Sequence, residues 1–268
     1  MNEVDVLSLN DNLKILKSIR LQRPFMIRTG MDLARDFNQF LEKTGHESIE
    51  ILQYVSTCGT RKDCLVKTLS MVEYLKGDYL DKGWFVSKNY LKNESFIQYE
   101  STLFAAFPDK GLHRMMNRRK PVAKNIWLSP PNKFTGLHYD ALDNFNIQIQ
   151  GQKTFYLAPP QCKNFYPGKI RCNEYHVSDV CNLFDYDQVK FSEFAGNIQD
   201  FYRATLNFGD LLFIPSFWWH QVHTVSEGLA VNINWWYPDF KMILKHLDKT
   251  FGAICLQIYR HNVQKYLL

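Results

Sequence analysis

Residues 144–158 read NFNIQIQGQKTFYLA and set the pattern for the fold. Two runs of strand-forming residues, 144–150 and 153–158, flank a Gln-Gly-Gln turn, which predicts a hairpin. Further short runs, bounded by Pro, Gly and Asn, occupy 125–128, 204–208, 211–214, 221–225 and 229–236, and Phe-Gly-Asp at 208–210 predicts a second hairpin turn. This density of short strands between about 122 and 237 favours an all-β sandwich or barrel.

The segments on either side of these strands carry mixed patterns. Before residue 122, the spacing of apolar residues predicts helices over 3–20, 31–43 and 67–77 and strands over 23–27, 47–55 and 84–86, whereas 96–107 shows no clean period. After residue 238, an apolar stripe predicts helices over 239–264. We therefore expect supporting helices and strands over 1–121, a β core over 122–238, and a helical segment over 239–268 that packs on the core or forms a homodimer interface.

The composition of the 268-residue chain is that of a soluble globular protein, with 46% hydrophobic and 22% charged residues. The net charge of +5 permits an acidic protein, RNA or an anionic small molecule as partner. The basic residues at 114–120 form either a solvated face or a patch for substrate or RNA. No apolar run approaches the ~20 residues of a membrane helix, and the N-terminus is acidic. We expect reduced thiols and a cytoplasmic location, or a nuclear one in a eukaryote.

Two histidines and one aspartate form the candidate metal site. His138 and Asp140 are two positions apart in Thr-Gly-Leu-His-Tyr-Asp (135–140), and on a strand this spacing directs both side chains to one side. His220 follows in Pro-Ser-Phe-Trp-Trp-His (215–220). Two imidazoles and a carboxylate on one triangular face leave coordination positions open, as in Fe(II) oxygenases. A His-x-Asp pair in isolation is more often a hydrogen-bonded surface pair, and His223 is an alternative to His220 in a less restrictive context.

Four polar residues near these motifs are candidates for binding a ligand. Lys153 begins the strand after the Gln-Gly-Gln turn, so it is either a solvated cation or, if it faces inward, an ammonium that needs an anion. Thr135 offers a hydroxyl three positions before His138. Asn144 and Asn234 stand in apolar strands, where their amides are either satisfied within the core or directed into a cavity.

Together these motifs resemble the JmjC or cupin-like oxygenases that depend on Fe(II) and 2-oxoglutarate, among them the asparaginyl hydroxylase of hypoxia-inducible factor and small JmjC hydroxylases. The N-terminal third matches only loosely. Order and spacing agree over about 122–238 for Thr-x-x-His-Tyr-Asp (135–140), Asn144, Gln-x-Gln-Gly-Gln-Lys (148–153), Leu-Ala-Pro-Pro (157–160), Gly-Asp-Leu-Leu-Phe-Ile-Pro (209–215), Trp-Trp-His (218–220) and Val-Asn-Ile-Asn-Trp-Trp (231–236).

The resemblance implies a mainly β fold with helical additions. Its core would be a double-stranded β-helix, the cupin-like jelly roll, with α/β elements before it and helices after it. Those C-terminal helices often form a homodimer in this family. His138, Asp140 and His220 would be the ligands of Fe(II) and the catalytic centre.

The resemblance also implies a site for the co-substrate 2-oxoglutarate. Thr135 and Lys153 would bind its C5 carboxylate, and Asn144 and Asn234 would lie near its C1 end and the metal. The sequence departs from the family at one position: a tyrosine hydroxyl often lies near the C5 carboxylate, but the residue that matches here is Phe85.

The implied reaction is hydroxylation of a protein side chain, with release of succinate and CO2. One alternative is hydroxylation of a modified tRNA base, which the basic stretch at 114–120 supports. Another is a non-catalytic cupin-like binding module, which would show a broken triad or no Lys153; the sequence has both intact. Histone demethylation is less favoured because the chain shows no obvious reader module.

Overall fold

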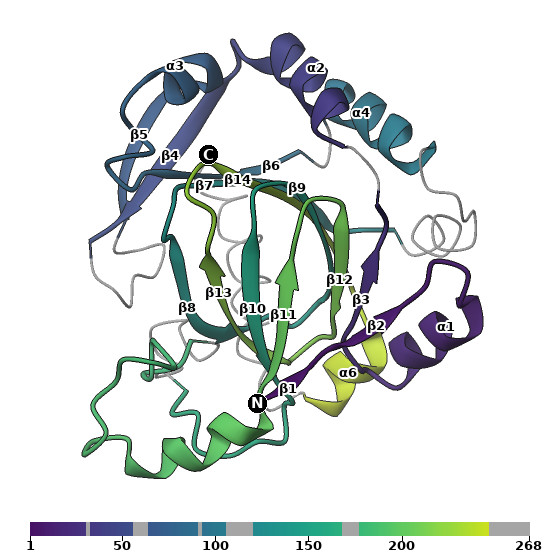
Figure 1. Ribbon diagram of the computed structural model, residues 1–268, viewed down its shortest axis with the longest axis vertical. Coiled ribbons are helices and arrows are strands. Elements are labelled where there is room, and N and C mark those ends of the chain that lie inside the picture. Colours follow the sequence, from purple (N-terminus) through teal and green to yellow (C-terminus); the bar gives the residue numbers. More distant parts are fainter. Residues whose placement is uncertain (31–32, 56–63, 91–92, 106–119, 168–176, 247–268) are drawn as a thin grey trace, which may run out of the picture.

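The fold in Figure 1 is that of a computed structural model, which describes residues 1–30, 33–55, 64–90, 93–105, 120–167 and 177–246. Two β-sheets face each other, and helices pack against both of them. The strands are β1 (Asn2–Glu3), β2 (Asp5–Leu7), β3 (Phe25–Arg28), β4 (Ser48–Tyr54), β5 (Cys64–Ser70), β6 (Phe85–Asn89), β7 (Ala123–Ser129), β8 (Phe134–Tyr139), β9 (Asp143–Gln150), β10 (Lys153–Ala158), β11 (Tyr202–Leu206), β12 (Asp210–Ile214), β13 (Trp219–Thr224) and β14 (Ala230–Tyr237). The helices are α1 (Asn12–Arg20), α2 (Ala34–Thr44), α3 (Met71–Lys76), α4 (Glu94–Ala105), the 3-10 helix η3 (Ser192–Asp200) and α6 (Phe240–Lys245).

The strands from β7 onward wind between the two sheets. The smaller sheet has the order β1-β11-β10-β13-β8, and the larger has the order β2-β3-β12-β9-β14-β7-β6-β4-β5. Every connection from β7 to β14 except β10–β11 therefore crosses from one sheet to the other. This winding is the jelly roll that the sequence predicted, and the N-terminal strands extend its edges.

Both predicted hairpins are wrong. The turn at Gly151 (φ +68°) connects β9 to β10, yet β9 pairs with β12 and β14 while β10 pairs with β11 and β13. The turn at Gly209 (φ +80°) likewise joins β11 to β12 in opposite sheets. A glycine with positive φ predicts a sharp change of direction. It does not predict pairing, because the partner of each strand is chosen by contacts distant in sequence.

Other departures concern element boundaries. The helix expected over 3–20 is confined to α1, because β1 and β2 occupy the residues before it. Residues 64–70 form β5, and helix α3 starts only at Met71, where the Ser70 hydroxyl accepts from the Glu73 N–H and the Glu73 carboxylate accepts from the Ser70 N–H. The aperiodic stretch at 96–107 lies largely in α4, and β8 was not among the predicted strands.

Side chains on β9 alternate between two buried environments. Phe145, Ile147 and Ile149 belong to the main hydrophobic core, which includes buried residues of α1, α2, α3 and α4. Asn144 and Asn146 line a cavity between the sheets instead. β14 shows the same division. Both faces of these strands are covered: one packs in the hydrophobic core, and the other borders the cavity between the sheets. The polar residues of β9 and β14 therefore point into the cavity, where they can contact a ligand.

Further predictions from the sequence concern the cysteines, membrane helices, the basic stretch and the C-terminal tail. Cys162 is a free thiol and Cys64 is in no disulfide, but Cys181 is disulfide-bonded, so the expected reduced thiols hold for two of the three cysteines described. Among the described helices, none is long and apolar enough to cross a membrane. The basic stretch at 114–119 and the tail at 247–268 lie outside the described residues.

Candidate metal centre and ligand cavity

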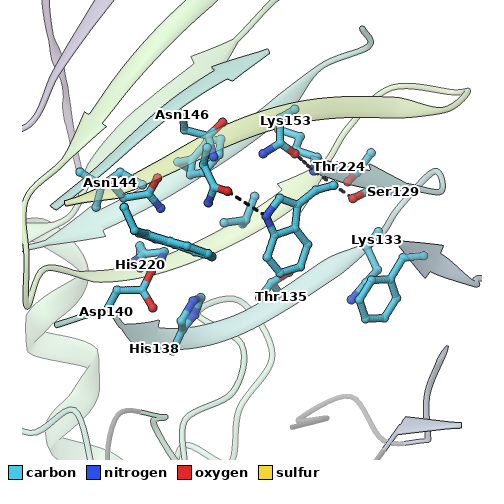
Figure 2. A pocket seen from close by; sticks show the side chains of 18 residues that line it. Ser129, Lys133, Thr135, His138, Asp140, Asn144, Asn146, Lys153, His220 and Thr224 are labelled. Atoms are coloured by element: carbon cyan, nitrogen blue, oxygen red, sulfur yellow. Dashed lines mark hydrogen bonds and ion pairs between the residues drawn. The ribbon is translucent and has the colours of Figure 1, made fainter. Parts of the chain in front are cut away.

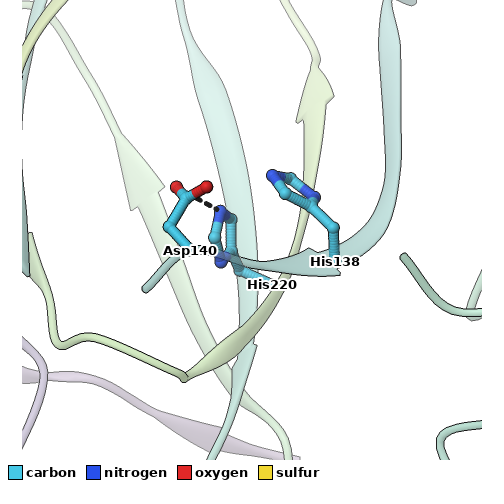
Figure 3. Close-up of side chains that lie close together, drawn as sticks. All are labelled: His138, Asp140 and His220. Atoms are coloured by element: carbon cyan, nitrogen blue, oxygen red, sulfur yellow. Dashed lines mark ion pairs between the residues drawn. The ribbon is translucent and has the colours of Figure 1, made fainter. Parts of the chain in front are cut away.

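The three candidate ligands come from two neighbouring antiparallel strands, β8 and β13. His138 and His220 are direct partners across these strands, and Asp140 follows immediately after β8 ends. Their ligand atoms all lie within 4.8 Å of one another, with the carboxylate beside the His220 ring (Figure 3). Strand pairing thus brings together residues that are far apart in the sequence.

Backbone carbonyls orient both imidazoles. The Nδ1 atom of His138 lies 2.7 Å from the Gly136 carbonyl oxygen, and the Nδ1 atom of His220 lies 3.0 Å from that of Trp218. Neutral rings that donate Nδ1–H to these carbonyls leave the Nε2 lone pairs available as ligands. The Nε2 atom of His220 lies 3.7 Å from Asp140 Oδ2. The rings are therefore held in a ligating orientation by groups outside the triad.

The electrostatics of the site favour a neutral His138. Burial, followed by repulsion from the His220 ring, lowers the pKa of His138 to about 4, although the Asp140 charge acts in the opposite direction. A histidine must be neutral to bind a metal, so no proton has to be removed from His138 at neutral pH.

His223 belongs to a different surface. It faces Phe134 across β13 and β8 and lines a separate cleft together with Asp179 and Gln221. Because side chains three positions apart on a strand face opposite sides, His220 and His223 are not interchangeable here. The triad with His220 is the arrangement that the structure brings together.

The triad lies at one side of a cavity between the two sheets (Figure 2). Thr135, Asn144, Lys153 and Asn234, the four ligand-binding candidates from the sequence, all line this cavity. Several other residues that line the cavity were not identified from the sequence: Trp127, Ser129, Lys133, Asn146, Thr224 and Asn232. Phe85 was named from the sequence, but the contact of its ring with Lys133 was not predicted. The asparagines among them were recognisable, because each is two positions from a predicted one and so shares its face of the strand.

Lys153 points into this cavity and is only 5% exposed. Its ammonium donates to the Ser129 hydroxyl at 2.9 Å and to the Asn232 side-chain oxygen. Both acceptors are neutral, and within the described ranges no carboxylate forms an ion pair with Lys153. Burial lowers the pKa of Lys153 to about 7. An anion entering the cavity would find an uncompensated ammonium.

A second lysine, Lys133, lines the same cavity. Its Nζ atom lies 3.6 Å from the centre of the Tyr54 ring and 4.2 Å from that of Phe85, and it donates to the Phe134 carbonyl at 2.8 Å. Burial, and then the charge of Lys153, lower the pKa of Lys133 to about 7. No sequence pattern singled out this residue, which stands just after a Pro-Pro-Asn turn before β8.

Several amide and indole groups around the cavity lack partners. The side-chain oxygens of Asn144 and Asn146 and the indole N–H of Trp236 are buried without a hydrogen bond among the described residues. The Asn234 oxygen accepts from the Trp127 indole N–H at 3.2 Å. Buried polar atoms without partners are uncommon in folded proteins, and a polar ligand would satisfy them.

These residues fit a bound Fe(II) and a small dicarboxylate. Two imidazole nitrogens and one carboxylate oxygen match the ligand preference of Fe(II) and leave coordination positions open. The ammonium of Lys153, which has no carboxylate partner among the described residues, and the unpartnered indole N–H of Trp236 match an anionic organic molecule that accepts hydrogen bonds.

Comparison with known proteins agrees with this geometry. The family profile described as the cupin-like domain matches residues 41–242. The chain belongs to the cupin-like domain family. The matched range contains the triad and both cavity lysines, and the relatives of this cupin-like chain include proteins named for the JmjC domain.

Individual relatives match this cupin-like chain over part of their length. JmjC domain-containing protein D of Dictyostelium discoideum is 32% identical over 116 residues, 43% of this chain and 25% of that protein. Human HSPB1-associated protein 1 is 29% identical over 160 residues, 59% of this chain and 30% of that protein. Human tRNA wybutosine-synthesizing protein 5 is 33% identical over 108 residues, 40% of this chain and 32% of that protein. The matched segments thus span a third or less of these relatives.

Proposed function

We propose that this cupin-like chain is a dioxygenase that depends on Fe(II) and 2-oxoglutarate. The observation that carries the proposal is one cavity that combines an open His138–Asp140–His220 triad with the buried, uncompensated ammonium of Lys153. A structural metal site needs no such cation, and a simple anion site needs no triad. 2-Oxoglutarate requires both, because its 2-oxo acid end binds the metal and its distal carboxylate binds a cation.

Each residue has a distinct role in this proposal. His138, Asp140 and His220 would hold Fe(II), and the carbonyls of Gly136 and Trp218 fix the orientation of the two imidazole rings. Bound Fe(II) supplies the activation of O2, coupled to decarboxylation of 2-oxoglutarate, so that one oxygen atom enters a substrate C–H bond and the other enters succinate. Lys153 and Thr135, which both line the cavity, orient the co-substrate through its C5 carboxylate.

The amides complete the site. Asn144 and Asn234 lie near the C1 end of the co-substrate in this proposal, and both line the cavity. The buried Asn144 oxygen, which lacks a partner among the described residues, is an acceptor that a water molecule could satisfy, because the dicarboxylate itself offers no donor. These contacts would set the orientation of the co-substrate rather than its reactivity.

A protein side chain is the leading substrate class, because the sequence motifs resemble those of protein hydroxylases. A modified tRNA base is the second class, and it is supported by the similarity to human tRNA wybutosine-synthesizing protein 5 and by the net charge of +5. The two classes differ in salt response: RNA binding weakens steeply as salt rises, whereas a salt-insensitive affinity would exclude RNA.

We also propose a cytoplasmic or nuclear location and a homodimer formed through residues 239–268. The described part of this segment, helix α6, leaves Phe240 and Leu244 exposed at 71% and 65%. Apolar side chains this exposed on one helix are typical of an interface.

The test of the proposed reaction is succinate formation from 2-oxoglutarate by the purified Fe(II)-loaded chain. We expect His138→Ala and Asp140→Ala to abolish turnover, because each removes a metal ligand. His223→Ala is the matched control, since it removes an imidazole from the opposite face of the same strand, and we expect it to retain turnover. Unchanged turnover in both ligand variants would refute the assignment of the triad.

A binding module is the competing class. It predicts that 2-oxoglutarate binds to the metal-loaded chain but that no succinate forms with any candidate protein or tRNA. Mass spectrometry of candidate proteins, in which hydroxylation adds one oxygen atom, separates the enzyme from the module and identifies the substrate in the same measurement.

A further inference from the structure

One side of the cavity holds two ammonium groups. In Figure 2, Lys133 and Lys153 lie with Ser129 and Thr224 on the side away from His138 and the rest of the triad. They come from different parts of the chain: Lys153 begins β10, while Lys133 precedes β8. Thr224 connects them, because its N–H donates to the Lys133 carbonyl at 2.8 Å and it is the strand partner of Lys153.

The two lysines repel each other and lack anionic partners. Both side chains line the same cavity, and the charge of Lys153 disfavours the charged form of Lys133 and so lowers its pKa. No carboxylate within the described part of the chain forms an ion pair with either of them. The folded protein therefore directs two like charges, or two amines held neutral, into one cavity. Such an arrangement is typical of a functional site.

Aromatic rings position Lys133 without neutralising it. Its Nζ atom lies close to the centres of the Tyr54 and Phe85 rings, at 3.6 and 4.2 Å, and its hydrogen bond goes to a backbone carbonyl. The negative faces of the rings attract and stabilise an ammonium. The ammonium still has donors left, because it carries three N–H groups and only one has an acceptor in the described structure.

We propose that Lys133 is a second cation for the distal carboxylate of the co-substrate, which it binds together with Lys153. Lys133 would then be a specificity-determining residue that favours 2-oxo acids bearing a second carboxylate. This inference rests on the proposed function, since it assumes that the same cavity holds 2-oxoglutarate.

Binding of a carboxylate by these two lysines should be coupled to proton uptake. With pKa values of about 7 in the ligand-free protein, both lysines are largely neutral at pH 8. A bound carboxylate favours their charged forms, so binding at pH 8 takes up protons, and the apparent affinity falls as the pH rises above 7. Two other titratable groups face Lys133: Tyr54 from β4, whose pKa burial raises to about 12, and Cys64 from β5.

The first test measures binding rather than turnover. Titration calorimetry compares 2-oxoglutarate with 2-oxopentanoate, which has a methyl group in place of the distal carboxylate, on the Mn(II)-loaded chain under argon. We expect Lys133→Met to weaken 2-oxoglutarate binding roughly tenfold to a hundredfold, with no loss for 2-oxopentanoate. Lys133→Arg should recover part of the affinity. Lys163→Met, at an exposed position, is the matched control and should leave both affinities unchanged.

The second test measures proton uptake at pH 8, by titrating 2-oxoglutarate in buffers of different ionisation enthalpy. We expect Lys133→Met to take up fewer protons than the wild-type chain, while the exposed control Lys163→Met takes up as many as the wild type. Equal uptake in Lys133→Met and wild type would overturn the role of Lys133, as would an unchanged 2-oxoglutarate affinity or an equal weakening of both ligands.

The same titrations separate this inference from the proposed function. If the wild-type chain binds 2-oxoglutarate and Lys153→Met abolishes binding while Lys133→Met leaves the affinity unchanged, the proposed function survives and the second-cation role fails. If the wild-type chain does not bind 2-oxoglutarate in the presence of the metal, the proposed function itself fails, and the role of Lys133 fails with it.

Discussion

At the scale of single residues, Lys153 combines near-complete burial with a cationic side chain. Burial lowers its pKa to about 7 in the folded protein, whereas an unfolded lysine titrates near ~10.4. Between these pH values the unfolded chain binds more protons, so the free energy of unfolding rises with pH over this range. The destabilisation by Lys153 is therefore complete below pH 7 and shrinks as the pH approaches 10.

We predict that Lys153→Met stabilises the ligand-free protein while it abolishes co-substrate binding. The free energy of unfolding should rise by about 1 kcal/mol at neutral pH, a typical value when a buried functional residue is replaced by an apolar one of similar size. Denaturant unfolding at pH 7 and pH 9.5 measures it, and the difference from wild type should narrow at the higher pH. A destabilised variant at both pH values would show that the bonds to Ser129 and Asn232 outweigh the burial of the charge.

At the scale of elements, the connection from β9 to β10 depends on Gly151. It has φ +68°, and a Cβ added there would lie 2.8 Å from Ser226 Oγ, 2.9 Å from the Leu229 carbonyl oxygen and 3.0 Å from Ala230 Cα. The turn therefore passes directly against the backbone that leads into β14. Because this turn places Asn144 and Lys153 on facing sheets, its geometry is coupled to the site.

We predict that Gly151→Ala destabilises the protein by about 2 kcal/mol or more, because it combines left-handed backbone strain with close contacts. Gly30→Ala is the matched control: Gly30 has φ +67° but no atom within 4 Å of an added Cβ, so that variant should show only the backbone strain, about 1 kcal/mol. Thermal and denaturant unfolding measure both. Equal losses in the two variants would mean that the contacts around Gly151 relax freely.

At the scale of the whole molecule, the proposed homodimer gives a prediction about α6. We expect the full chain to sediment as a dimer and Phe240→Glu to sediment as a monomer, because a buried charge in an apolar interface is unfavourable. Phe184→Glu, which changes another exposed phenylalanine (60% exposed) far from α6 in the sequence, is the matched control and should remain dimeric. A wild-type chain that stays monomeric, or a dimeric Phe240→Glu variant with wild-type stability, would contradict the dimer.

The sequence by itself predicted an all-β core, its family resemblance implied the jelly roll, and it named the triad and four of the other residues that line the cavity. Spacing of two on a strand fixes a common face, so His138 and Asp140 could be paired from their positions alone, and glycine turns marked where the chain reverses. Only the tertiary structure decided which sheet each strand joins, and with it that the predicted hairpins are crossings between sheets. It alone showed that Lys133 and Lys153 share one cavity. The physical reason is that the side of a strand on which a side chain lies, and the position of a turn, are local properties of the backbone. The partner of each strand depends instead on hydrogen bonds and packing between segments far apart in the chain.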